Sequence, residues 1–94
     1  MTNAEKLAGI FKLLSVAARV RIVQALKRRA MCVTELTSQL GLSQEATSQQ
    51  LRVLRDAGII WFQKRGFHVY YSLDKQNIAS MHKAISALYE PSYK

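Results

Sequence analysis

The strongest constraint on the fold is a pair of helical patterns separated by a glycine-containing corner. Residues 34–40 begin with Thr34, a residue type that caps helices, and Glu35 follows near the expected positive end of that helix. Gly41 is the residue type that most often ends a helix, and Ser43 can cap the next one. Two helices joined by a short glycine-containing turn form a helix-turn-helix unit, which this segment is predicted to adopt.

Apolar residues at helical spacing predict three further helices. The first covers residues 3–14, and the second covers residues 15–29 with Ser15 as its cap. Asp74 can cap a last helix in the same way. The apolar face of the second helix is expected to consist of Val16, Val20, Val23 and Leu26.

A β-hairpin is predicted between the fourth helix and the last one. The segments IIWFQK and FHVYYSL are rich in β-branched and aromatic residues, and Arg65-Gly66 forms a tight turn between them. The segment MCV, before the helix-turn-helix, is expected to be a short extended link. The predicted fold class is therefore mainly α with a small β-hairpin, a winged helix-turn-helix in a single domain over residues 1–94.

The fourth predicted helix separates an apolar side from a polar one. At about 100° per residue, Leu51 falls at the margin of the apolar side and Thr47 at its boundary. The apolar side gathers Ala46, Gln50, Val53, Leu54 and Ala57. The polar side gathers Gln44, Glu45, Ser48, Gln49, Arg52, Arg55 and Asp56. Its first two turns thus carry mostly short uncharged side chains, although Lys and Glu are better helix formers than Ser and Thr.

Uncharged donors and acceptors on this helix suit the edges of DNA bases. A Gln amide can pair with adenine, a Ser hydroxyl can bond several base edges, and helix-turn-helix proteins place the first turns of the recognition helix there. Arg52 and Arg55 lie further along and are predicted to contact phosphates. An ordinary solvated surface is the alternative, but the preceding turn and the following hairpin favour DNA. The predicted base-reading residues are Gln44, Glu45, Ser48 and Gln49.

The chain is strongly basic, with 14 Lys and Arg residues against 6 Asp and Glu and a formal net charge of +8. This balance favours a polyanionic partner, either nucleic acid or an anionic membrane surface. At the hairpin tip, Lys64 and Arg65 are predicted to contact phosphates, or Arg65 to enter a narrow minor groove, although a solvated turn explains both residues equally well. The basic second helix would also suit a membrane-surface or protein-interaction module, the alternative from a different class.

Several other classes of protein are disfavoured by the sequence. It shows no carboxylate pair, no Gly-rich phosphate loop and no nucleophile with a matched base, so an enzyme is not expected. The single cysteine, Cys32, excludes an internal disulfide and a four-cysteine zinc module, and neither a cofactor nor a metal site is expected. No leader peptide is visible, and the longest apolar run, residues 59–62, is far too short to span a bilayer. A cytoplasmic protein without a membrane partner is therefore expected.

The first and last helices carry more apolar surface than the core of one chain can cover. Burying that surface between two chains is favourable by roughly 25 cal/mol per Å². The sequence therefore predicts a homodimer whose contact is formed by these two helices. The residues assigned to it are Leu7, Phe11, Leu14, Ile78, Met81, Ile85 and Leu88.

Four segments resemble the ArsR/SmtB family of bacterial winged-helix repressors, in the order and spacing of that family. They are FKLLSVAARVRIVQAL, MCVTEL, LGLSQEATSQQLRVLRDAGII and RGFHVYYSL, and together they extend over nearly the whole chain. The resemblance implies a homodimer held by its first and last helices, with two recognition helices on a palindromic DNA operator. It also implies that a ligand, often a metal ion, releases the protein from its promoter.

The sequence departs from this family at its metal sites. Relatives that sense soft metals have two cysteines one residue apart, whereas this chain has Cys32 and then Thr34. It also has Val16-Ala17 where the family usually opens the second helix with Asp-Pro, which makes Ser15 the substitute cap. His82 alone is expected to be a surface or dimer-contact residue. The positions of the last helix that bind zinc in relatives hold Lys75, Asn77, Leu88 and Pro91, or with a shift of one Asp74, Gln76, Ala87 and Glu90.

Cys32 therefore has three interpretations. It is a small buried apolar residue, a sensor thiol for oxidants or reactive sulfur that pairs with a thiol from outside the chain, or a ligand in a metal site with unidentified partners. The function predicted from the sequence is a bacterial DNA-binding regulator, a repressor first, that a thiol-reactive or metal signal releases. The alternative of the same fold is an anti-silencer or constitutive repressor without an inducer. The operator, the regulated genes and the inducer are not predicted.

Overall fold

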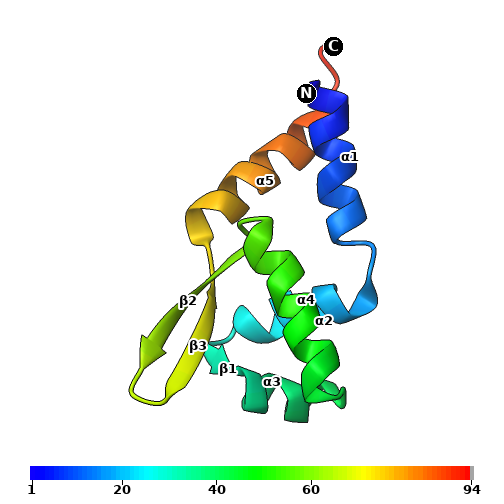
Figure 1. The fold of residues 1–94 in the computed structure, drawn as a ribbon. Coiled ribbons are helices and arrows are strands. Elements are labelled where there is room, and N and C mark those ends of the chain that lie inside the picture. Colours follow the sequence, from blue (N-terminus) through cyan, green and yellow to red (C-terminus); the bar gives the residue numbers. More distant parts are fainter. Residues whose placement is uncertain (94) are drawn as a thin grey trace.

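The computed structural model describes residues 1–93, which form a winged helix-turn-helix with a helix added at each end (Figure 1). The helices α2, α3 and α4 and the β-sheet form the lower part of the molecule in Figure 1, and α1 and α5 lie together at the upper end. The predicted fold class is confirmed. The elements are α1 Asn3–Leu13, α2 Ala17–Leu26, β1 Met31–Cys32, α3 Val33–Leu40, α4 Gln44–Asp56, β2 Ile60–Arg65, β3 His68–Leu73 and α5 Lys75–Tyr89.

The core lies where the three central helices meet the sheet. Each of α2, α3, α4, β1 and β2 contributes buried apolar side chains to one cluster. In α2 the most deeply buried residue is Ile22, whereas Val20, which the helical spacing assigned to the apolar face, is exposed. The side chains that are almost completely buried in this cluster are Ile22, Met31, Leu36, Leu51, Leu54 and Ile59.

The predicted cap of the second helix is wrong. Ser15 Oγ donates a 2.6 Å hydrogen bond back to the carbonyl oxygen of Lys12, in the last turn of α1. The hydroxyl therefore satisfies an orphan carbonyl of the preceding helix. α2 begins one residue later than expected, with Val16 as an N-cap that has no side-chain acceptor, and it ends at Leu26 rather than at residue 29.

The third helix also starts at a different cap from the one predicted. Its N-cap is Cys32 and not Thr34, and the Cys32 backbone N–H donates a 3.3 Å hydrogen bond to Glu35 Oε1. The preceding link is a short strand, β1, in which Met31 pairs with Tyr71 and Cys32 with Tyr70. The hairpin is therefore extended to a three-stranded antiparallel sheet in the order β1-β3-β2.

The other predicted punctuation residues are confirmed. Gly41 closes α3 with a left-handed φ of 66°, a conformation that glycine adopts without steric cost. Ser43 caps α4, because its Oγ accepts a 3.0 Å hydrogen bond from the N–H of Ala46. Asp74 caps α5 by accepting a 3.1 Å hydrogen bond from the N–H of Asn77. Together these caps define the start of the recognition helix and the turn into the last helix.

The hairpin turn is shifted by one residue from its predicted position. Arg65 pairs with His68 as the last rung of β2 and β3, so the turn consists of Gly66 and Phe67. Gly66 has a φ of 62°, whereas Phe67 does not have a positive φ. This is the pattern of a type II′ turn, whose twist matches that of the two strands. Within residues 1–93 no helix combines the length and apolar character needed to cross a membrane.

Candidate nucleic-acid interface

The helix α4 is held to the core by a row of three buried side chains. Thr47, Leu51 and Leu54 are each at most 1% exposed. The buried face is therefore rotated by roughly one residue from the predicted one, which placed Thr47 and Leu51 only at its edge. Burial of Thr47 is possible because its Oγ1 donates a 2.9 Å hydrogen bond to the carbonyl oxygen of Ser43, so the hydroxyl stays satisfied.

The opposite face of α4 is exposed, and it carries every residue that the sequence assigned to base or phosphate contacts on this helix. A shallow depression of about 350 Å³ is lined by Glu45, Ser48, Gln49 and Arg52. Gln44 lies exposed at the start of the helix, just after the cap at Ser43. The structure therefore brings three of the four predicted base-reading residues together with one predicted phosphate contact.

Arg55 is the point at which α4 meets the wing. Its guanidinium carbon lies 5.4 Å from the ring centroid of Phe62 on β2, a cation–π contact. The Phe62 ring lies 6.1 Å from that of Tyr71, its cross-strand neighbour on β3. A second depression of about 150 Å³ lies beside Tyr71 and is lined from α4 by Ser48, Leu51, Arg52 and Arg55. Recognition helix and sheet thus form one continuous polar surface, which the sequence did not predict because the contacts are between distant residues.

The wing carries two exposed basic residues, Lys64 and Arg65, at the end of β2. The Arg65 guanidinium lies 5.5 Å from the Tyr70 ring centroid and donates a 3.4 Å hydrogen bond to Gln63 Oε1. Arg65 therefore lies along the outer face of the sheet, with its charge still open to solvent. Lys64 belongs to the other face of the strand, because side chains alternate along a β-strand.

A single arginine links the recognition helix to two other helices. Arg19 Nε donates a 2.8 Å hydrogen bond to Gln50 Oε1 in α4, and its Nη1 donates a 3.2 Å hydrogen bond to the carbonyl oxygen of Leu13 in α1. The sequence assigned Gln50 to the apolar side of α4. Its amide is instead half-buried and occupied by Arg19, and only a polar residue on a packed face would have hinted at such a partner.

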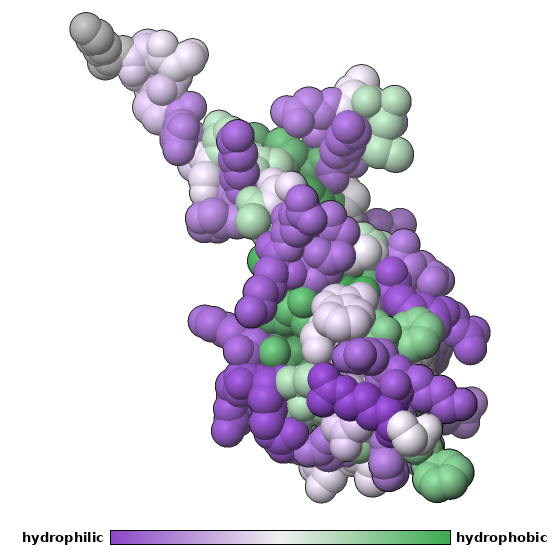
Figure 2. All heavy atoms as spheres, turned by 90° about the vertical axis from the view of Figure 1, so that its left-hand side faces the viewer, coloured by the Kyte–Doolittle hydropathy of each residue, from purple (hydrophilic) through white to green (hydrophobic). Residues whose placement is uncertain are grey.

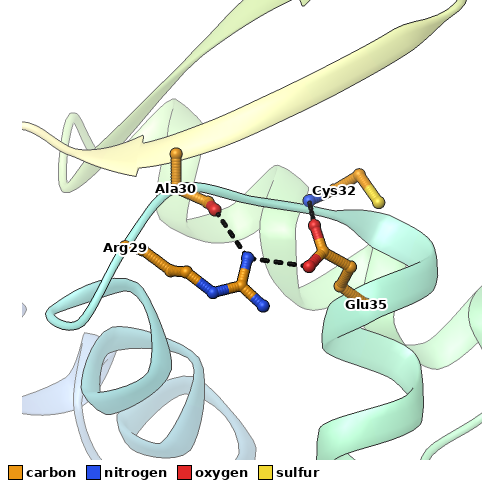
Figure 3. A network of polar contacts seen from close by, with 4 residues as sticks. All are labelled: Arg29, Ala30, Cys32 and Glu35. Atoms are coloured by element: carbon orange, nitrogen blue, oxygen red, sulfur yellow. Dashed lines mark hydrogen bonds and ion pairs between the residues drawn. The ribbon is translucent and has the colours of Figure 1, made fainter.

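Cys32 lies beside a small polar network at the start of α3 (Figure 3). Glu35 accepts the hydrogen bond from the Cys32 backbone and forms a 2.7 Å ion pair with Arg29, whose Nη1 also donates to the carbonyl oxygen of Ala30. Hydrogen bonding from Arg29, followed by that from the Cys32 backbone, lowers the pKa of Glu35. The thiol is half-buried. In the part of the chain that the structure describes, no three His, Cys, Asp or Glu side chains are grouped as they would be to hold a metal ion.

A second, apolar surface is formed by α1 and α5. Leu7 is buried within the chain and has little surface left for a partner, whereas Phe11 is 40% and Leu88 50% exposed. An apolar depression of about 200 Å³ is lined by Leu14, Val23, Ile59, Ile78, Met81, His82 and Ile85. Figure 2 shows apolar surface, in green, among hydrophilic side chains in the upper part of the molecule, where these helices lie. The predicted dimer residues other than Leu7 are thus half-buried or exposed in the single chain.

Comparisons with known proteins agree with this architecture. Residues 17–60 match the family described as bacterial regulatory protein, arsR family. A transcriptional repressor SmtB homolog from Synechocystis sp. is 30% identical over 92% of the chain, which spans 65% of that relative's length. A biofilm growth-associated repressor from Xylella fastidiosa is 33% identical, over 93% of the chain and 74% of the relative.

The fold is also similar to that of solved structures. Reduced HlyU from Vibrio cholerae superposes with a TM-score of 0.76 at 31% identity, over 95% of this chain and 94% of that one. The helix order, the capped recognition helix and the hairpin wing are thus shared along nearly the whole chain. The protein belongs to the arsR family of bacterial regulatory proteins, a family of winged helix-turn-helix transcriptional regulators rather than enzymes.

Proposed function

We propose that this protein is a transcriptional repressor that binds a palindromic DNA operator as a homodimer in the bacterial cytoplasm. The observation that carries the proposal is the exposed polar face of α4, where Glu45, Ser48, Gln49 and Arg52 line one depression. A net charge of +8 supplies the attraction to the phosphate backbone. The relatives named as repressors support the direction of the regulation.

In this proposal the residues of α4 divide into two roles. Gln44, Glu45, Ser48 and Gln49 lie on the first turns and meet base edges in the major groove. Arg52 and Arg55 lie further along and meet phosphates, as do Lys64 and Arg65 on the wing. Phosphate contacts position the protein, and base contacts determine which sequence it prefers.

The homodimer places two copies of α4 on one face of the duplex. The contact is formed by Phe11 and Leu14 of α1 and by Ile78, Met81, Ile85 and Leu88 of α5, with Leu7 as a buried support behind them. A two-fold dimer recognises a palindrome whose half-sites are about one helical turn, or a multiple of it, apart. The affinity of the dimer then depends on both α4 helices binding at once.

Cys32 is the residue through which a thiol-reactive signal would act in this proposal. It is the N-cap of α3, the helix that supports α4, so a change at the thiol alters the base of the recognition helix. The test is to treat the DNA complexes of the wild type and of Cys32→Ser with peroxide, persulfide, arsenite and zinc in turn, and to follow dissociation. Release of the wild type alone supports a Cys32 sensor, whereas release of neither supports a repressor without an inducer acting at this thiol.

Binding to DNA is distinguished from binding to a membrane surface by one comparison at fixed salt. The protein is titrated with duplexes of different sequence and with vesicles of increasing anionic lipid content. Preference for one duplex sequence, with little response to lipid composition, supports the proposal. Binding that follows the anionic lipid content and ignores DNA sequence would instead support the membrane-surface alternative.

A further inference from the structure

The apex of the wing carries a wholly exposed aromatic side chain. Phe67 has a relative exposure of 101%, the highest among the exposed large hydrophobic residues of the chain. It is the second residue of the two-residue turn between β2 and β3, between Gly66 and His68. A phenyl ring in water gains nothing from burial, so this ring does not contribute to the stability of the folded chain.

Neither the turn nor the sheet requires a phenylalanine at this position. The turn depends on Gly66, whose φ is 62°, because a type II′ turn needs glycine at its first central position. The second position accepts small polar residues, which would also be better suited to water. The aromatic ring at the apex is therefore explained by a partner rather than by the fold.

The surroundings of Phe67 indicate the chemistry of that partner. Lys64 and Arg65 are exposed at the end of β2, so the apolar tip is flanked by positive charge. The tip projects from the body at the end of the molecule where α4 begins, away from α1 and α5 (Figure 1). Arg55 and Phe62 connect α4 to the base of the same hairpin, which limits how far the wing can turn from the recognition helix.

We propose that Phe67 is a wedge that enters the DNA minor groove beside each half-site and partly unstacks a base step there. This inference rests on the proposed function and adds to it a specificity-determining residue outside α4. Apolar wedges in the minor groove unstack bases and kink the duplex, and pyrimidine–purine steps unstack most easily. The flanking charges of Lys64 and Arg65 neutralise the phosphates on the groove walls. Phe67 thereby selects flexible steps at a position that no hydrogen bond reads.

The test uses the full chain and the duplex that the wild type enriches from random DNA. Phe67→Ser keeps a residue suited to the turn, Phe67→Leu keeps an apolar wedge, and Lys64→Ala is the matched control for a lost charge. Affinity is measured over a series of salt concentrations, and bending by energy transfer between dyes at the duplex ends. Unstacking is followed by the fluorescence of 2-aminopurine placed at the wing-proximal step.

The expected result is a loss of affinity of about tenfold for Phe67→Ser, within the range that burial of one aromatic ring supports. The salt dependence stays as in the wild type because no phosphate contact is lost, and the bend and the 2-aminopurine signal decrease. Phe67→Leu retains most of the affinity and the bend. Lys64→Ala shows the opposite pattern, with a shallower salt dependence and an unchanged bend.

The wedge is contradicted if Phe67→Ser binds and bends the enriched duplex as the wild type does. It is equally contradicted if Phe67→Ser loses binding to vesicles of anionic lipid and keeps its affinity for DNA, since the ring would then be a membrane anchor. In both cases the wild-type preference for one sequence leaves the proposed function standing. A wild type that prefers no sequence contradicts the proposed function, and the wedge with it.

Discussion

Arg19 and Gln50 join α2 to the recognition helix through a 2.8 Å hydrogen bond from Nε to Oε1. The same guanidinium reaches the carbonyl oxygen of Leu13 at the end of α1, so three helices meet at one side chain. Because α1 carries part of the proposed dimer surface, Arg19 connects that surface to the orientation of α4. The planar guanidinium can bond in both directions at once, which a lysine ammonium cannot do with the same geometry.

Replacing Arg19 by lysine is expected to loosen this junction. Hydrogen bonds that involve a charged group contribute about 1.5–3 kcal/mol, so Arg19→Lys should lower the free energy of unfolding by about 1–2 kcal/mol. Affinity for specific DNA should also fall, because α4 is held less firmly. Arg21→Lys, at an exposed position of the same helix, is the matched control. Urea unfolding of both variants checks the prediction, and equal stabilities would show that the junction is not strained by the change.

Base reading and phosphate binding on α4 are separable by substitution. Gln49→Ala or Ser48→Ala should cost about 1–3 kcal/mol on the best site and relax the preference at one base pair per half-site. Arg52→Ala should weaken binding to specific and random DNA alike and lower the salt slope by about one unit. Titrations of both DNA types over a salt series measure this. A changed sequence preference in Arg52→Ala, with none in the other two, would contradict the assigned roles.

The homodimer depends on the apolar side of α5. Leu88 is half exposed there, so Leu88→Glu places a charge in the proposed contact and should give monomers. Ala87 lies on the opposite side of the helix and is exposed, which makes Ala87→Glu a control with the same added charge. Sedimentation at micromolar concentration should show a dimer for the wild type and for Ala87→Glu. A monomeric wild type would refute the dimer.

Glu35 is expected to make folding sensitive to acid. Its pKa is lowered in the folded chain, chiefly by the hydrogen bond from Arg29, so the folded state binds this proton more weakly than the unfolded state does. The carboxylate therefore contributes stability that is fully present above the unfolded-state pKa of about 4.3 and is lost as the pH falls through the folded-state value. Thermal unfolding between about pH 6 and pH 3 should show a smaller fall in Tm for Glu35→Gln than for the wild type. Identical falls would exclude this role for the carboxyl group.

The element order and the exposed face of α4 could be predicted from the sequence because both depend on local patterns. Apolar spacing placed the helices, Gly41 and Ser43 marked the turn, and alternation marked the hairpin. The errors concern groups whose partners lie outside the local pattern. Ser15 bonds backward to Lys12 rather than forward, and Thr47 could be buried only because its hydroxyl is satisfied within its own helix.

The contacts that support the site could not be predicted in the same way. Arg19 and Gln50 are 31 residues apart, and neither residue type carries a signal for the other. Arg55 and Phe62 meet only because α4 packs beside β2, so their contact follows from the tertiary arrangement. Phe67 was inside a predicted hairpin strand, and only its full exposure at the turn separates it from the aromatic residues that support the sheet.

Selection of bound sequences from random duplex DNA tests the central claim most directly. At one fixed salt concentration, the enriched sequences should converge on a palindrome whose half-sites are about one helical turn of 10–10.5 base pairs, or a multiple of it, apart. Gln49→Ala, selected in parallel, should give the same palindrome with one relaxed position in each half-site. A wild-type selection that enriches no sequence after repeated rounds, with binding set by salt concentration alone, would contradict sequence-specific repression by this protein.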